Sequence, residues 1–243
     1  MCTASIARYN TPREQMDAVL RFVTGVFYTL SVSASPNGES SRVQNLTPPD
    51  SSIIFNMNMN AEKLMQVAAL ILKKNGGTMD YYNLIKECYI ADRRSVEAMG
   101  FSITGDSYVS MNRGPVLKGL YAFIKNTSSD SAAQERWNAC FSVSDHKISL
   151  TDASISNSYL SRYDESVLSE VAEQFYGYSY EDMKRYAHAD GRFPEWEAVR
   201  KGEEKPIPMQ AVMRAVGISE TEIGQLMAEQ YAFKREAELF RST

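Results

Sequence analysis

The sequence predicts a mainly α-helical domain with a small antiparallel β element, which is an α+β fold. Three observations predict it: long segments with apolar residues at helical spacing, short segments of alternating polarity, and glycine- or proline-containing turns between them. The chain has 243 residues, of which 44% are hydrophobic and 23% charged, so it can bury a sizeable core. We therefore expect a compact helical domain that carries a short strand and a β-hairpin.

The first 56 residues are predicted to differ from the rest of the chain. Residues 11–30 show the pattern of an amphipathic helix that begins with a capping box and a proline. Its apolar face suits packing on its own domain or on a partner, and the candidate partner-binding residues are Met16, Leu20, Val23 and Phe27. Residues 31–52 are rich in Ser, Pro and Asn, as linkers are. We expect a helix plus linker over 1–56 and a compact domain over 57–243, with an internal translation start at Met57 or Met59 as an open alternative.

The compact domain is predicted to consist mostly of helices. Apolar periodicity, capping residues and terminal glycines predict helices over residues 60–74, 80–99, 164–176, 179–188, 209–216 and 219–240. Pro115 is expected at the first position of a further helix, after a short strand through Tyr108 and Val109. Alternation over residues 136–150 predicts the hairpin, with a polar loop before it; Trp137, Ala139, Phe141 and Val143 share one face, and Ser144 and Asp145 form the turn.

Composition excludes several function classes. The formal net charge of −4 gives no general attraction to nucleic acid or to anionic membranes. Three widely spaced cysteines and two isolated histidines predict neither a disulfide framework nor a zinc site, so we expect a reducing cytoplasm and no metal or cofactor. The N-terminus lacks the pattern of a signal peptide, and the longest apolar run is too short for a membrane span.

No sequence motif of an enzyme is present, so we expect a protein without catalytic activity. Asp92 and Asp106 could form the acid–base pair of a hydrolase, but no serine or histidine is spaced to join them. Residues 209–230 could form a DNA-binding helix-turn-helix. The second helix of that pair has three acidic residues and no basic ones, which disfavours nucleic acid and favours a plain helical hairpin.

One set of motifs is specific. The segment "LIKECYIADRRSVEAMGFSITGDSYVSMNRGPV" resembles the Panacea domain, also called the SocA-like antitoxin domain, and the later "YGYSYEDMKRYAHADGRFPEW" is similar to the C-terminal signature of that family. The residues that carry the resemblance are Tyr89, Ala91, Asp92, Arg93, Gly100, Ile103, Thr104, Gly105, Asp106, Tyr108, Gly114, Pro115, Val116, Tyr176, Gly177, His188, Pro194 and Trp196. The resemblance covers about Met59 to Trp196 and leaves residues 1–56 outside.

The resemblance implies a function by binding. Members of the family are typically antitoxins of bacterial or phage toxin–antitoxin pairs that neutralise a cognate toxin by direct contact, and for this chain we expect such a role in a prophage or in phage defence. One member acts as a proteolysis adaptor to a ClpXP-type protease, which makes that role the alternative for this chain; a DNA-binding autorepressor is less favoured. The partners implied are a toxin and, as alternatives, the protease or a second copy of the chain.

The motif residues themselves are expected to be structural more than partner-contacting. On a helical wheel Asp92 lies at about 80°, in the middle of the apolar stripe of residues 84–99, so its carboxylate must be hydrogen-bonded. Thr104 to Tyr108 follow directly and offer backbone N–H groups and a tyrosine hydroxyl. We therefore predict that Asp92 fastens the long helix to the turn after it, and that its loss costs roughly 1–3 kcal/mol.

Overall fold

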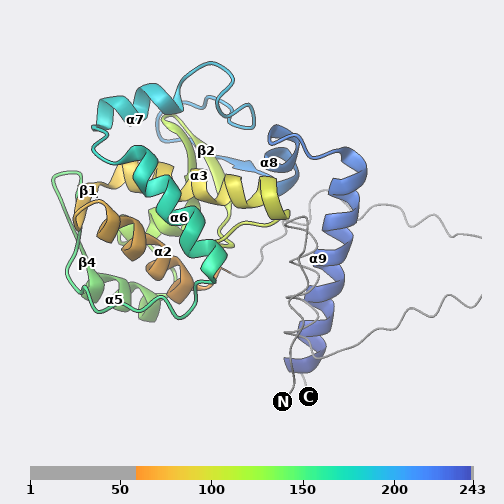
Figure 1. The fold of residues 1–243 in the computed structure, drawn as a ribbon, viewed down its shortest axis with the longest axis horizontal. Helices are drawn as coiled ribbons and strands as arrows, with labels where there is room; N and C mark the ends of the chain where they lie inside the picture. Colours follow the sequence, from red (N-terminus) through yellow and green to blue (C-terminus); the bar gives the residue numbers. More distant parts are fainter. Residues whose placement is uncertain (1–58, 242–243) are drawn as a thin grey trace, which may run out of the picture. The chain divides into compact units, whose positions relative to one another are not determined.

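The structure is a computed structural model that describes residues 59–241, with side chains described as far as residue 232. Its helices are α2 (Ala61–Lys74), α3 (Tyr81–Met99), α4 (Lys118–Ile124), α5 (Ser131–Cys140), α6 (Arg162–Phe175), α7 (Tyr180–Ala187), α8 (Met209–Ala215) and α9 (Glu220–Arg241). The strands are β1 (Thr78–Asp80), β2 (Tyr108–Met111), β3 (Gly114–Leu117), β4 (Phe141–Ser144), β5 (Lys147–Leu150) and β6 (Lys205–Ile207). The predicted α+β class is confirmed (Figure 1).

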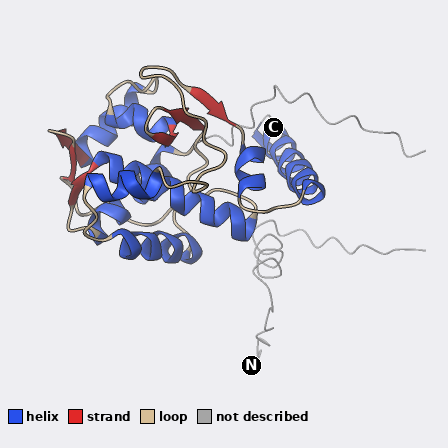
Figure 2. Cartoon of the chain, turned by 90° about the horizontal axis from the view of Figure 1, so that it is seen from above, coloured by secondary structure: helices blue, strands red, loops and turns tan. Residues whose placement is uncertain are grey.

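The strands form two small antiparallel sheets at different places around the helices (Figure 2). In the first sheet β5 lies between β1 and β4, and in the second β2 lies between β3 and β6. The second sheet joins distant parts of the chain, because Tyr108 pairs with Leu117 on one side and with Ile207 on the other. This arrangement brings β6, which the sequence did not predict, next to the motif region.

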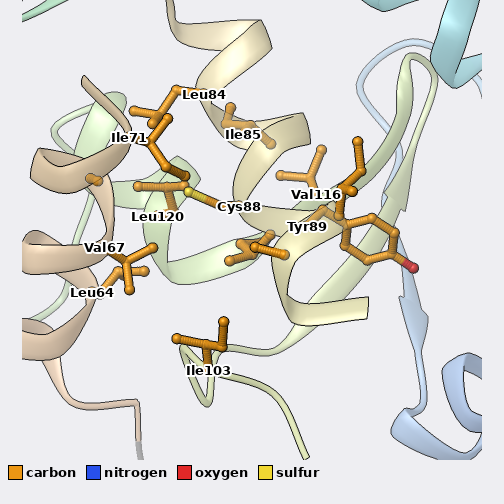
Figure 3. Packing of buried hydrophobic residues seen from close by; sticks show 14 of the residues in the cluster. Leu64, Val67, Ile71, Leu84, Ile85, Cys88, Tyr89, Ile103, Val116 and Leu120 are labelled. Atoms are coloured by element: carbon orange, nitrogen blue, oxygen red, sulfur yellow. The ribbon is translucent and has the colours of Figure 1, made fainter. Parts of the chain in front are cut away.

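The core is built around α3. This helix packs against α2 and α6 and also contacts β3, α7 and α8. Figure 3 shows side chains of α2 directed towards α3 and α4; those labelled are Leu64, Val67 and Ile71 on one side and Leu84, Cys88 and Leu120 on the other. All of these six side chains are fully buried. Because neighbours surround α3 on several sides, several of its polar residues are buried as well as its apolar stripe.

The helix boundaries predicted from capping signals are confirmed for α2, α3, α6, α7, α8 and α9 to within one or two residues. The side chain of Asn60 accepts hydrogen bonds from the first turn of α2, and Ser161 and Ser179 form reciprocal capping boxes. Gly100 ends α3 at φ 81°, a left-handed conformation that glycine adopts without strain. Helices α8 and α9 contact each other as the predicted hairpin.

The prediction that a helix starts at Pro115 is wrong. Gly114–Leu117 is strand β3, and helix α4 begins only at Lys118. Proline is compatible with this strand because β3 lies at the edge of its sheet, where a missing N–H leaves no ladder bond unpaired. The fixed φ of Pro115 therefore suited the first helical position and an edge strand equally well, and the pairing with β2 decides between them.

The strands of the predicted hairpin are confirmed, but the prediction for the residues that precede them is wrong. Residues 131–140, expected to be a polar loop and the start of a strand, form helix α5, capped by the side chain of Asp130. Trp137 consequently lies on a helix, where it stacks on Phe141 at the start of β4. The turn is displaced by one residue: Asp145 and His146 both have positive φ, at 47° and 66°, as a two-residue hairpin turn requires.

Across residues 59–241, no helix combines the length and the apolar character that crossing a bilayer requires.

Candidate functional site

The motif residues gather where the second half of α3 meets the loop 100–107, the sheet β3-β2-β6 and the segment 193–196. Several polar side chains of this region are buried, including those of Lys86, Asp92, Thr104, Asp106 and Ser110. A buried polar group is costly unless it is hydrogen-bonded, so each of them calls for a partner. The partners show what the motif does.

Asp92 makes the contact that the sequence predicted. Its side chain is 1% exposed, and it accepts hydrogen bonds from the Thr104 N–H at 2.9 Å, the Thr104 hydroxyl at 2.5 Å and the Tyr108 hydroxyl at 3.0 Å. Burial raises the pKa of this carboxyl to about 6, although the three donors oppose the shift. Asp92 thus fastens α3 to the turn and to β2, and both of its oxygens are occupied.

Asp106 holds the start of α4 from a distance. Its carboxylate accepts from the backbone N–H groups of Ser107, Gly119 and Leu120 at 2.7–2.9 Å. Helix α4 has no cap from its own N-cap residue, so Asp106 satisfies two of its free N–H groups and its charge lies at the positive end of the helix. A Cβ on Gly119 would collide with Met59 Sδ and lie 3.0 Å from both carboxylate oxygens, which favours glycine at this position. Burial raises the pKa of Asp106.

Tyr89 and Arg93 connect α3 to a segment about a hundred residues later. The Tyr89 hydroxyl donates to Glu195 Oε1 at 2.7 Å, and Arg93 Nε donates to the same oxygen at 2.9 Å. The Glu195 side chain is fully buried, and Arg93 also reaches the carbonyl of Ala215. One turn of α3 therefore fixes both the segment 193–196 and the end of α8.

The remaining C-terminal motif residues close the same region. Trp196 Nε1 donates to the carbonyl of Met111 at 2.8 Å, and its ring lies edge-on to the ring of His188, with centroids 5.1 Å apart. His188 is the C-cap residue of α7, as expected for a histidine at a helix end. Burial is the main cause that lowers the pKa of His188. These contacts fasten the 188–196 segment to the β2–β3 hairpin.

Gly114 lies against a buried lysine. Lys86, 1% exposed, donates from Nζ to the Pro115 carbonyl at 2.5 Å, and its ammonium lies 5.1 Å from the centre of the Tyr82 ring. A Cβ on Gly114, whose φ is 104°, would lie 2.9 Å from that Nζ. Burial lowers the pKa of Lys86 to about 7. The glycine of the motif thus admits both an unusual backbone angle and a close side chain.

The structure therefore brings ten of the predicted site residues together around α3 and its neighbours: Tyr89, Asp92, Arg93, Gly105, Asp106, Tyr108, Gly114, Pro115, His188 and Trp196. Asp92 and Asp106 are each occupied by separate sets of donors rather than shared in one acid–base pair. The four candidate partner-binding residues, Met16, Leu20, Val23 and Phe27, lie outside the described residues.

Sequence reasoning missed Lys86, Glu87 and Glu195. Lys86 and Glu87 lie off the apolar stripe of α3, where an amphipathic pattern predicts exposure. Glu195 stands in the "FPEW" segment beside two residues that the motif singled out, and that neighbourhood was the available signal. Within residues 59–241, no group of three or more His, Cys, Asp or Glu side chains is arranged to hold a metal ion.

Comparison with known proteins gives one family. The family model described as "Antitoxin SocA-like, Panacea domain" matches residues 84–197 and confirms the resemblance drawn from the motifs. The match begins in α3 and ends one residue after Trp196, so it contains the contacts of Asp92, Asp106 and Trp196 described above, whereas the Tyr82 ring and the Ala215 carbonyl lie outside it. No curated protein and no solved structure gave a significant match to the chain.

Proposed function

We propose, from the premise that residues 84–197 are a Panacea domain, that this chain is an antitoxin that neutralises a cognate toxin by direct protein–protein binding. The family match is the observation that carries the proposal. The family is antitoxin-like and generally non-enzymatic, so the action expected of this chain is to bind another protein.

The chemistry of the motif region is consistent with a binding scaffold. The two motif aspartates have both oxygens taken by hydrogen-bond donors of the same domain. A general acid or base needs an oxygen within hydrogen-bond reach of the substrate, so these aspartates suit a scaffold better than a hydrolase. We infer that the motif builds the domain and that the surface around it contacts the toxin.

Co-expression tests the proposal. The product of the gene adjacent to this one is expressed in a bacterial host with and without this chain, and growth is measured together with complex formation by size-exclusion chromatography. We expect the neighbour to arrest growth alone, and growth to return with a co-eluting complex when both are present. Arrest that persists, with the two proteins eluting separately, would contradict direct neutralisation.

Strains with and without the ClpXP-type protease distinguish the adaptor alternative from direct neutralisation. An adaptor shortens the half-life of the toxin in a strain that contains the ClpXP-type protease and loses its effect when the protease is deleted. A neutralising antitoxin restores growth equally in both strains and leaves the half-life of the toxin unchanged or longer.

The proposal assigns toxin binding to residues 57–243. It treats residues 1–56 as an appendage that the family match does not cover. If translation begins at Met57 or Met59, deletion of residues 1–56 is expected to leave neutralisation intact, as growth in the co-expression assay would show. Loss of neutralisation, with the shortened chain still folded by circular dichroism, would instead place toxin contacts in the first helix.

A further inference from the structure

Both edges of the second sheet carry a proline whose nitrogen faces away from the sheet. The Lys118 N–H donates to the Ser107 carbonyl beside the β2–β3 ladder, and hydrogen-bonded pairs alternate along antiparallel strands. Pro115 therefore occupies an outward position of β3, where its carbonyl accepts from Lys86. Pro206 occupies an outward position of β6, because the β2 residue opposite it bonds to β3. Neither edge offers an N–H donor at these positions, so both are poor templates for a further strand.

The outer edge of β4, in the first sheet, has no such protection. The Leu150 N–H donates to the Gly77 carbonyl, so Leu150 and, by alternation, Ile148 make their backbone hydrogen bonds towards β1. A second bond at the other end of this ladder agrees with that alternation. Val143 lies opposite Ile148 in β4. The N–H and C=O of Val143 therefore point away from β5, and we call this side of β4 the Val143 edge.

The Val143 edge is exposed to solvent. Residues 142–147 are all exposed, with Val143 at 40%, and β4 is the end strand of its sheet at the periphery of the fold (Figure 1). The other end strand, β1, has one exposed residue, Thr78, before the chain enters α3, and every residue of β3 is buried. Among the strands of residues 59–241, β4 thus presents the most open edge, and an open edge can pair with another strand.

The two faces of β4 differ in polarity. Val143 shares a face with Phe141 and is paired with Ile148, and both of these neighbours are buried. Ser142 and Ser144 lie on the other face and are exposed. Side chains directly opposite each other on paired strands interact, so an apolar residue beside Val143 would extend the apolar face. A strand that fits this edge alternates in polarity and places an apolar residue opposite Val143.

A second copy of this chain fits the edge less well than a different protein does. Two β4 strands could pair about Val143, but the Phe141 N–H is already bonded to the Trp137 carbonyl, and Asp145 leaves the strand with φ at 47°. Only the N–H and C=O of Val143 would then bond on each side. So short a pairing buries far less than the roughly 1,200 Å² at which specific interfaces begin. A partner with further contacts to the domain can use the edge as one part of a larger interface.

We propose that the Val143 edge receives an extended strand of the toxin, which becomes the fourth strand of the first sheet. A carbonyl of the toxin accepts from the Val143 N–H, an N–H of the toxin donates to the Val143 C=O, and an apolar toxin residue lies opposite the Val143 side chain. That the partner is the toxin rests on the proposed function. The position and polarity of the edge stand on β4 and its neighbours alone.

Amide hydrogen exchange tests the pairing directly. The full-length chain is purified alone and with the product of the adjacent gene, and exchange is measured by NMR at single residues. We expect the Val143 amide to exchange freely in the chain alone and at least tenfold more slowly in the complex. The Ser142 amide, which bonds to β5, is the internal control and should be protected in both states.

Two substitutions at one position complete the test. Val143→Pro reproduces at β4 the arrangement found at Pro115 and Pro206: it removes the outward N–H and leaves the bonds to β5 in place. It should weaken the complex at least tenfold. Val143→Thr keeps the N–H and the branched side chain, so it should weaken the complex less than threefold, and circular dichroism checks that both variants fold. Undiminished binding by Val143→Pro would overturn the proposal.

The outcomes distinguish this inference from the proposed function. Neutralisation by a complex in which the Val143 amide exchanges freely would overturn the strand pairing and leave the antitoxin proposal supported. Protection of Val143 without recovery of growth would contradict neutralisation and support the pairing. Absence of any complex would overturn both. A free chain that elutes as a dimer, with Val143→Pro eluting as a monomer, would assign the edge to a second copy and overturn its assignment to the toxin.

Discussion

The buried carboxylates in the two halves of α3 differ in how many hydrogen bonds they accept. In the second half of the helix, Asp92 receives three hydrogen bonds from the loop and strand that follow. In the first half, Glu87 receives one, from Asn75, and keeps an oxygen without a partner in the described structure. Burial raises the pKa of both groups, to about 6 for Asp92 and to about 8 for Glu87, and the larger shift belongs to the group with fewer donors.

This difference shows how hydrogen bonding decides whether a buried carboxylate stabilises or destabilises the fold. A satisfied buried carboxylate stabilises the fold, so removing it leaves donors without an acceptor and costs stability. An unsatisfied one destabilises the fold, and replacing it with a neutral isostere should help. The contrast therefore predicts changes in stability that differ in size and in sign from one position to the next.

The largest effect is expected from Asp92→Ala. The change leaves the Thr104 N–H, the Thr104 hydroxyl and the Tyr108 hydroxyl buried without an acceptor, so the free energy of unfolding should fall by about 3 kcal/mol. Urea denaturation measures it. Asp190→Ala, in an exposed turn, is the control and should change the stability by less than about 0.5 kcal/mol. An unchanged midpoint for Asp92→Ala would contradict a structural role for the motif.

A smaller loss is expected from Asp106→Ala. Helix α4 would lose the acceptor for Gly119 and Leu120 and the negative charge at its N-terminus, together worth about 2 kcal/mol. Asp106→Asn keeps one oxygen and should lose roughly half as much. If alanine and asparagine cost the same, the charge rather than the hydrogen bonds would carry the effect.

Glu87→Gln should stabilise the protein, whereas the two aspartate variants should destabilise it. Since the pKa of Glu87 rises from 4.5 to about 8 on folding, the folded state holds a proton that the unfolded chain has released, and stability falls as the pH rises between these values. Glutamine removes this penalty, so the variant should exceed the wild type by about 1 kcal/mol or more at pH 8.5 and by much less at pH 5. Thermal unfolding at both pH values measures the difference.

The comparison with the variant is necessary because Lys86 acts in the opposite direction. Burial lowers the pKa of Lys86 from 10.5 to about 7, so its contribution makes stability rise with pH between those values. The two slopes overlap between pH 7 and pH 8 in the wild type. Subtracting the Glu87→Gln curve isolates the contribution of Glu87, and a difference that does not grow with pH would contradict a raised pKa at Glu87.

Tyr176→Ala should have the smallest effect on stability. Its side chain is exposed, so the free energy of unfolding should stay within about 0.5 kcal/mol of the wild type. Urea denaturation measures the change, and a loss well above that range would contradict the exposed placement of this ring.

Much of the helical framework could be predicted because its signals are local. Each capping residue contacts backbone groups only a few positions away in the sequence. This holds for Asn60, Gly100, Ser161 and Ser179. The failures share a different cause. Pro115 suits a helix start or an edge strand, and only pairing with β2 selects the strand, while β6 depends on a partner about a hundred residues earlier.

The candidate site also contains residues that could be predicted from the sequence and residues that could not. The contact of Asp92 with Thr104 and Tyr108 was predictable, because its partners follow within sixteen residues and the helical wheel shows that the residue is buried. Glu87 and Lys86 were not, because the wheel assigns a helix one buried face. Helix α3 is covered on several sides, so positions off its apolar stripe are buried too.

The hydrogen bond between Tyr89 and Glu195 also sets an order of events. The two residues are 106 positions apart, so this link closes a long loop and must wait until the intervening chain is present. On the ribosome, α2 and α3 can emerge and pair early, whereas the centre of the domain cannot be completed before residue 195 leaves the exit tunnel. We therefore expect the domain to reach its native state late in synthesis, after most of the chain has been made.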